Sequence, residues 1–182
     1  MKSNGKTTIV ASIEPKQIMK ELALTIPSAD LSSETEQNTN ISNLVGEFFQ
    51  DNKRLKKNSI SSIINELLTN GLKYSDADSD IKLNSYATNG TFCVLMENVC
   101  SPPQLKYLNK YMKTVIQSNK PAIDLYIERS IALSESHSLK RAQLGLISLM
   151  SNFGCTLDIQ TQDINGLCIV STTVSFNGMV QQ

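Results

Sequence analysis

An acid, an amide and a lysine could do chemistry together in the segment IINELLTNGLKYS, residues 63–75. Glu66, Asn70 and Lys73 follow at i, i+4 and i+7, so they share one stripe of a helix with about 3.6 residues per turn. Such a stripe is typical of an exposed helix face with weak side-chain pairing. It also suits a metal–phosphate site, because amide oxygens bind Mg²⁺ and ammonium groups bind phosphate. The spacing alone leaves both interpretations open.

A helix predicted at 58–74 would carry this stripe, with Asn58 or Ser59 as its N-cap. The other predicted elements are strands at 7–13, 80–87, 91–97, 155–162 and 167–176, and helices at 15–25, from Asn43, at 103–117, 121–135 and 141–153. Asn89-Gly90 is a hairpin signal between two of these strands. Residues 27–40 are rich in Ser, Thr and Asn and are predicted to form an exposed loop.

The order of these elements predicts the fold class. Hairpins separated by helices indicate an α+β two-layer sandwich, with a mixed, mostly antiparallel sheet and the helices on one face. The 182 residues suit a single domain over 1–182. In that domain, 1–57 would supply the N-terminal strand and the leading helices.

Composition excludes several classes of protein. Lys+Arg and Asp+Glu balance at 17 each, which gives no electrostatic argument for binding nucleic acid or an anionic membrane. No apolar run is long enough to span a membrane, and the N-terminus lacks the apolar core of an export signal. The cysteines match no metal-binding spacing, so a reducing, cytoplasmic location is expected. They are Cys93, Cys100, Cys155 and Cys168.

The segment IINELLTNGLKYS resembles the N-box helix of the GHKL ATPase superfamily, which includes sensor histidine kinases and anti-sigma-factor kinases. The resemblance implies that Asn70 is a Mg²⁺ ligand and that Glu66 is the polar group beside the phosphates. It also implies that Lys73 faces phosphate and that Tyr74 is the aromatic residue near the nucleotide.

A second segment, FCVLMENVCSP at 92–102, is similar to the strand that leads into the adenine-binding DxGxG motif of that superfamily. Asn98 stands in the place of the aspartate, and both glycines are missing. An asparagine oxygen can still accept a hydrogen bond from adenine, although without charge. The alternative is an ordinary strand end before a Pro-Pro turn.

A third segment, RAQLGLISLMSNFG at 141–154, is similar to the GxGLGL segment that closes the ATP lid of the superfamily and opens a helix. Leu144-Gly145-Leu146 matches the end of that motif, Gln143 replaces a glycine, and Arg141 could add charge toward phosphate. The alternative is a packed helix in which Gly145 allows close approach. The resemblance covers 58–176 and implies a helical lid at 100–140, as in the SiaB-type branch of the superfamily.

The resemblance implies a bacterial regulator, and two functions compete for it. The first is a partner-switching Ser/Thr protein kinase that uses ATP and Mg²⁺, with Glu66 as the group that accepts the hydroxyl proton. The second is a non-catalytic regulator that binds a protein partner and has weak or no nucleotide affinity, as the lost glycines suggest. In either case the partner is a regulatory protein, a phosphoacceptor or a bound antagonist, and the resemblance also allows a homodimer. His137 lies in a predicted loop, where we expect it to be exposed and without a chemical role.

Overall fold

The computed structural model describes residues 18–31, 36–50, 55–76, 79–116, 118–135, 144–164 and 166–178. The strand predicted at 7–13, Arg141 and His137 lie outside these residues.

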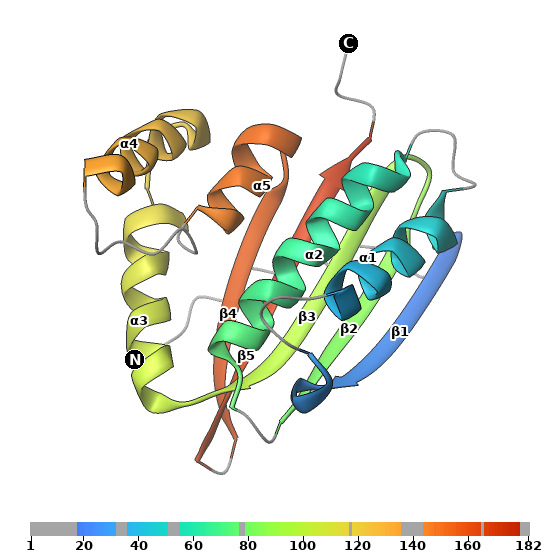
Figure 1. The fold of residues 1–182 in the computed structure, drawn as a ribbon, viewed down its shortest axis with the longest axis horizontal. Helices are drawn as coiled ribbons and strands as arrows, with labels where there is room; N and C mark the ends of the chain where they lie inside the picture. The colour runs from blue at the N-terminus through green and yellow to red at the C-terminus, as the bar shows by residue number, and fades with distance from the viewer. Residues whose placement is uncertain are drawn as a thin grey trace.

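A five-stranded sheet forms one layer of the molecule, in the order β1-β2-β3-β5-β4 (Figure 1). The strands are β1 (Lys20–Pro27), β2 (Asp80–Ala87), β3 (Thr91–Cys100), β4 (Thr156–Ile164) and β5 (Leu167–Asn177). Every pairing in this sheet is antiparallel. The predicted mixed sheet is therefore antiparallel throughout the described residues.

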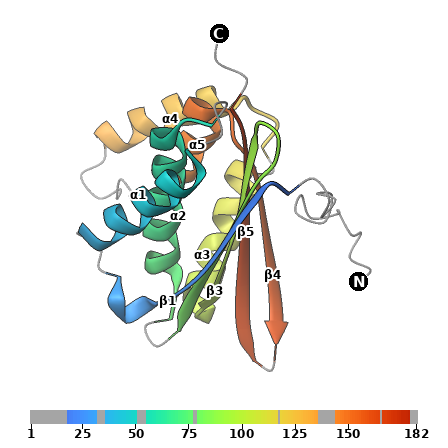
Figure 2. The ribbon, with the colours of Figure 1, turned by 90° about the vertical axis from the view of Figure 1, so that its right-hand side faces the viewer.

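The helices form the second layer. They are α1 (Glu36–Phe49), α2 (Lys57–Tyr74), α3 (Pro102–Tyr111), α4 (Ala122–Glu135) and α5 (Gly145–Phe153), with a short 3₁₀ turn η3 (Ser28–Asp30) and a π-helical turn η4 (Met112–Ile116). Figure 2 shows the helices on one side of the sheet. The fold is thus an α+β two-layer sandwich, as the order of elements predicts.

Helix α2 packs over the sheet because one of its faces is apolar. Its buried residues are Ile60, Ile63, Ile64, Leu67, Leu68, Asn70 and Gly71. A Cβ atom added to Gly71 would lie 2.8 Å from the Met96 sulfur, so this glycine lets the helix approach β3 closely. The close approach brings the end of α2 that carries Asn70 against the middle of the sheet.

The helix predicted at 15–25 is wrong over its described part. Residues Lys20–Pro27 form the edge strand β1, paired with β2. Its sequence, KELALTIP, alternates polar and apolar residues, so Leu22, Leu24 and Ile26 share one face of the sheet. This period of two outweighs the weak helical spacing of the same residues.

The boundaries of the next segment also differ. Helix α1 begins at Glu36, whereas we expected a loop as far as residue 40 and a helix only from Asn43. Glu36 lies in the first turn, where a carboxylate interacts favourably with the helix dipole. Asn38 and Ser42 are buried on the same helix face. The polar composition of this segment favours a loop and does not show that Asn38 and Ser42 are buried on one face of a helix.

The other described elements lie where the sequence predicts them. Gly90, in the predicted hairpin turn between β2 and β3, has a φ of 96°. Gly154 has a φ of 63° and ends α5. These are left-handed conformations, which glycine adopts without strain.

Candidate functional site

Asn70 and Glu66 are joined within α2. The Asn70 Nδ2 donates to the Glu66 Oε1 at 2.8 Å and to the Glu66 carbonyl at 2.7 Å. Asn70 is buried, so these two bonds fix the orientation of its amide. The stripe that the sequence could not distinguish from an exposed helix face is therefore partly buried and internally bonded.

The Glu66 carboxylate lies against the first residue of α5. A Cβ atom on Gly145 would overlap this carboxylate, so only glycine permits the observed approach. Burial raises the pKa of Glu66, while the Asn70 amide and the Lys73 ammonium act in the opposite direction. A buried carboxyl with a raised pKa is suited to accept a proton at neutral pH.

A cavity of about 20 Å³ lies between α2, the middle of the sheet and α3. Its lining residues are Leu67, Asn70, Tyr74, Met96, Asn98, Leu108, Tyr111, Leu146, Ile159, Val170 and Thr172. Asn98 points to the helix side of β3, because it lies two residues from Met96 and from Cys100 and so shares their buried face. The volume is enough for about one water molecule, whereas small-molecule pockets span roughly 300–1,000 Å³. The cavity is closed to a nucleotide in this conformation.

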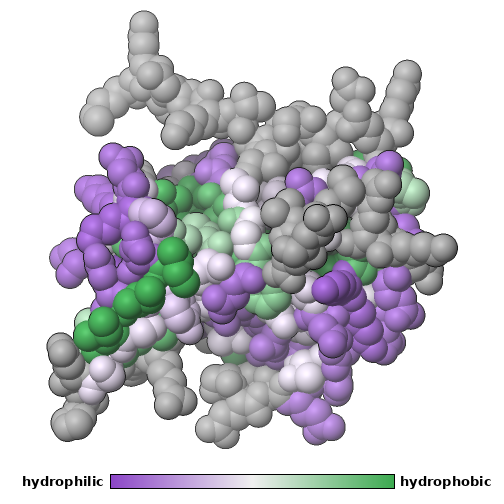
Figure 3. Space-filling model, turned by 90° about the horizontal axis from the view of Figure 1, so that it is seen from above, coloured by the Kyte–Doolittle hydropathy of each residue, from purple (hydrophilic) through white to green (hydrophobic). Residues whose placement is uncertain are grey.

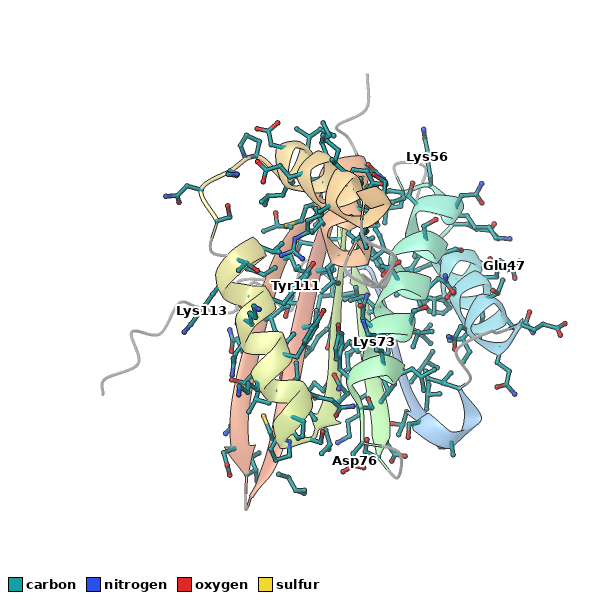
Figure 4. All side chains as sticks on the ribbon, turned by 60° about the vertical axis from the view of Figure 1, so that its left-hand side comes forward. Glu47, Lys56, Lys73, Asp76, Tyr111 and Lys113 are labelled. Atoms are coloured by element: carbon teal, nitrogen blue, oxygen red, sulfur yellow. The ribbon has the colours of Figure 1, made fainter. Side chains whose placement is uncertain are left out.

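Helix α3 closes the cavity. Leu108 and Tyr111 lie on its inner face and line the cavity opposite Asn70 and Asn98. Figure 4 shows Tyr111 pointing from α3 toward α2. Burial raises the pKa of the Tyr111 phenol. The inner face of α3 therefore fills the space that the resemblance assigns to a ligand.

Two polar atoms of the cavity lining have no partner among the described residues. They are the Asn98 Nδ2 and the Tyr111 hydroxyl, and both residues are more than nine-tenths buried. An unpaired buried polar group costs about 1–3 kcal/mol. The closed cavity thus retains two hydrogen-bonding groups that a ligand, or a water molecule, could satisfy.

An aromatic pair joins α2 to α3 beside the cavity. The rings of Tyr74 and Tyr107 stack, with their centroids 5.9 Å apart. The Lys73 ammonium lies 4.8 Å from the Tyr74 centroid and 5.9 Å from the Tyr107 centroid. Partial burial lowers the pKa of Lys73. Lys73 is thus held against two rings and does not line the cavity.

Gln104 anchors the start of α3 to the end of α2. Its Nε2 donates to the carbonyls of Lys73 at 3.3 Å and Ser75 at 3.4 Å. Its Oε1 accepts from the Ser101 hydroxyl at 2.7 Å and the Ser101 amide at 3.0 Å. A single side chain therefore both caps α3 and holds it over α2.

The C-terminal end of α3 is held by α4. The Arg129 guanidinium lies 5.6 Å from the Tyr111 ring centroid and donates to the Thr114 hydroxyl at 3.1 Å. Thr114 belongs to the π-helical turn η4 that follows α3. Such π-helical turns are rare and often occur at functional sites.

The structure brings together most of the residues that the sequence singled out. Asn70, Tyr74 and Asn98 line one cavity, and Glu66 links Asn70 to Gly145. Leu144 precedes α5 without lining the cavity, and Leu146 lines it instead. Arg141 lies outside the described residues.

The sequence does not indicate that Tyr107 stacks on Tyr74 or that Tyr111 lines the cavity. The pair lies at i, i+4 on α3, a spacing that identifies one helix face but not the residues opposite it. Only the folded arrangement shows that this face meets Tyr74 and the cavity.

Helix α4 carries an exposed apolar ridge, which crosses the lower left of Figure 3. Ile123, Ile127 and Ile131 lie at i, i+4 and i+8 and are 49%, 50% and 52% exposed. Leu125 is the buried residue through which α4 contacts the core. The helix predicted at 121–135 is therefore confirmed, and its three exposed isoleucines do not line the cavity.

No protein-family model matches the sequence, and no curated protein sequence matches it significantly. Within the described ranges, no helix has the length and apolar character needed to cross a membrane. The same residues contain no cluster of three or more His, Cys, Asp and Glu side chains that could bind a metal ion.

Proposed function

We propose that this chain is a GHKL-type bacterial regulator of partner switching that binds Mg·ATP in the α2–β3–α3 cavity and phosphorylates a Ser or Thr hydroxyl of a protein partner. One observation carries the proposal. Three segments far apart in the sequence, resembling the superfamily's motifs in the family's order, meet in the fold: Asn70 and Asn98 line one cavity, and Gly145 lies against Glu66.

The residues present fit this chemistry in part. Asn70 offers an amide for Mg²⁺, Asn98 offers a buried amide for adenine, and Lys73 offers an ammonium within the same region of α2. Mg·ATP, when bound, would supply the phosphoryl group, and the chain would contribute positioning and charge neutralisation. Glu66, whose pKa is raised by burial, would accept the proton of the partner's hydroxyl. A nucleotide requires that α3 first move away.

Calorimetric titration with Mg·ATP tests the proposal. We expect binding to wild type that is lost in Asn70→Ala and retained in Asn65→Ala. Asn65 is the matched control, because it is an exposed asparagine of the same helix. No heat from wild type at millimolar nucleotide would contradict ATP binding, and so the kinase activity. Equal binding by the two variants would remove Asn70 from the site.

A specific observation favours a second function, the non-catalytic regulator. The cavity has room for about one water molecule, and α3 fills the remainder with Leu108 and Tyr111. The segment after Asn98 also lacks both glycines that allow a backbone to approach a nucleotide closely. In this case α3 would be a permanent part of the core, and the chain would act only by binding its protein partner.

A further inference from the structure

The outer face of α3 carries a basic stripe. Lys106, Lys110 and Lys113 are exposed and follow at i, i+4 and i+7 through α3 and η4. Figure 4 shows Lys113 pointing away from the side on which Tyr111 enters the molecule. The stripe borders an open hollow of about 540 Å³, whose described lining also includes Pro102, Leu105, Asn109 and Thr114. No acidic side chain is among these lining residues.

The stripe is unusual for a chain with no net charge. The stretch from 98 to 123 contains Lys106, Lys110, Lys113 and Lys120 and no Asp or Glu. Lys120, just before α4, pairs with Glu128 of that helix, whereas the described residues show no ion pair for Lys106, Lys110 and Lys113. Like charges at i, i+3 and i+4 destabilise a helix by about 0.2–0.5 kcal/mol per pair. A negatively charged partner would relieve this repulsion.

We propose that an acidic segment of a protein partner docks on the Lys106–Lys110–Lys113 stripe and, by engaging α3, controls the opening of the cavity beneath it. The binding of Mg·ATP in the opened cavity rests on the proposed function. The docking surface itself depends only on the charges and exposure of α3.

The same helix connects the two sites. Lys110 and Tyr111 are neighbours in the sequence, yet Lys110 lies on the outer face and Tyr111 in the cavity. A partner that moves α3 by its outer face must also move Leu108 and Tyr111, because they belong to one rigid helix. The contacts opposing this movement include the burial of Leu108 and Tyr111 in the core, the Gln104 hydrogen bonds, the Tyr74–Tyr107 stack and the contact of Arg129 with Tyr111.

An acidic protein segment fits the stripe better than nucleic acid does. The basic stretch is one helix long, and the chain as a whole is neutral, whereas nucleic-acid binding usually rests on an extended positive surface. The hollow is also lined by Pro102 and the half-buried Leu105, which suits side chains of mixed character.

Fluorescence anisotropy of a labelled oligoglutamate peptide, without nucleotide, tests the docking surface. We expect wild type to bind the peptide, with affinity that falls as salt is added, and Lys106→Glu/Lys110→Glu to bind at least about tenfold more weakly. The matched control is Lys56→Glu/Lys82→Glu, which changes the net charge equally at two exposed lysines elsewhere. No binding by wild type, or an equal loss in both variants, would overturn the proposal. Equally tight binding of an oligodeoxythymidine of the same charge, with the same loss, would assign the stripe to nucleic acid instead.

A second experiment tests whether binding at the lysine stripe moves α3 away from the cavity. The chain has no tryptophan, so Tyr107→Trp places a single reporter in the stack with Tyr74. We expect the oligoglutamate peptide to shift its emission to the red as α3 leaves α2. Peptide binding without a shift would overturn the coupling. Because no nucleotide is present, failure of either experiment is distinct from failure of ATP binding.

Discussion

Opposing effects act on the pKa of Glu66. The Asn70 amide and the Lys73 ammonium favour its charged form, whereas burial against α5 disfavours it and has the largest effect. A carboxyl in this position is costly for stability, which is a common property of groups that do chemistry.

The pH dependence of stability tests this environment. Because the pKa of Glu66 in the folded protein is raised above 4.5, the folded protein binds this proton more tightly than the unfolded chain. The contribution of Glu66 to stability is therefore fully present below about pH 4.5 and is lost as the pH rises through the folded-state pKa. We expect Glu66→Gln to raise the melting temperature at pH 8 by about 2–4 °C and to change it little at pH 4. Glu21→Gln, at an exposed site, is the control; the same pH-dependent gain in both variants would contradict the assignment.

The contact between Glu66 and Gly145 gives a second test at the residue scale. We expect Gly145→Ala to cost about 1–3 kcal/mol of unfolding free energy, because its methyl group would displace the Glu66 carboxylate from Asn70. In a Glu66→Ala background the same change should cost little, since alanine favours helices over glycine. Urea unfolding of the four proteins gives the coupling energy. Additive effects within about 0.5 kcal/mol would show that the two residues do not contact each other.

The sequence predicts these residues better than it predicts their environment. The spacing of Glu66 and Asn70 and the three motif-like segments identify the side chains that meet. The spacing could not show that Asn70 is buried, or that Gly145 faces Glu66, because both depend on how α5 packs on α2.

The sequence shows that α3 is a helix, but it does not show which residues the inner face of α3 meets. The apolar spacing of QLKYLNKYM predicts a helix, and the structure confirms one over Pro102–Tyr111. The spacing does not show that its inner face enters a cavity lined by Asn70 and Asn98. The wrong prediction at 15–25 has a similar origin, since only pairing with β2 shows that the alternation in KELALTIP belongs to a strand.

The attachment of α3 through Gln104 is testable by hydrogen exchange. We expect Gln104→Ala to reduce the protection of backbone amides in 102–116 by about 1 kcal/mol, because it removes both the helix cap and the bonds to α2. Asn109→Ala is the control, since Asn109 is an exposed residue on the outer face of the same helix. Equal protection in both variants would mean that Gln104 does not hold α3 in place.

At the scale of the whole molecule, one core connects the sheet to all the helices around the site. Leu108, Tyr111, Val115 and Leu125 belong to the same buried cluster as the residues of α2 and the sheet. The helices α3 and α4, which the resemblance predicts to form a lid, are thus continuous with the core. Movement of α3 must therefore be driven by a ligand or partner that contributes free energy.

We propose that α3 fills the space of a nucleotide site. The affinity of Leu108→Ala/Tyr111→Ala for Mg·ATP, measured by calorimetry beside wild type, tests it most directly. The matched control is Leu105→Ala/Tyr126→Ala, which truncates a leucine and a tyrosine that do not line the cavity. Circular dichroism must first show that each variant is folded.

We expect that opening the cavity strengthens Mg·ATP binding by about tenfold or more, because the open form is then a larger fraction of the protein. The control variant should bind as wild type does. A folded Leu108→Ala/Tyr111→Ala variant that gives no heat at millimolar Mg·ATP would show that α3 does not cover a nucleotide site.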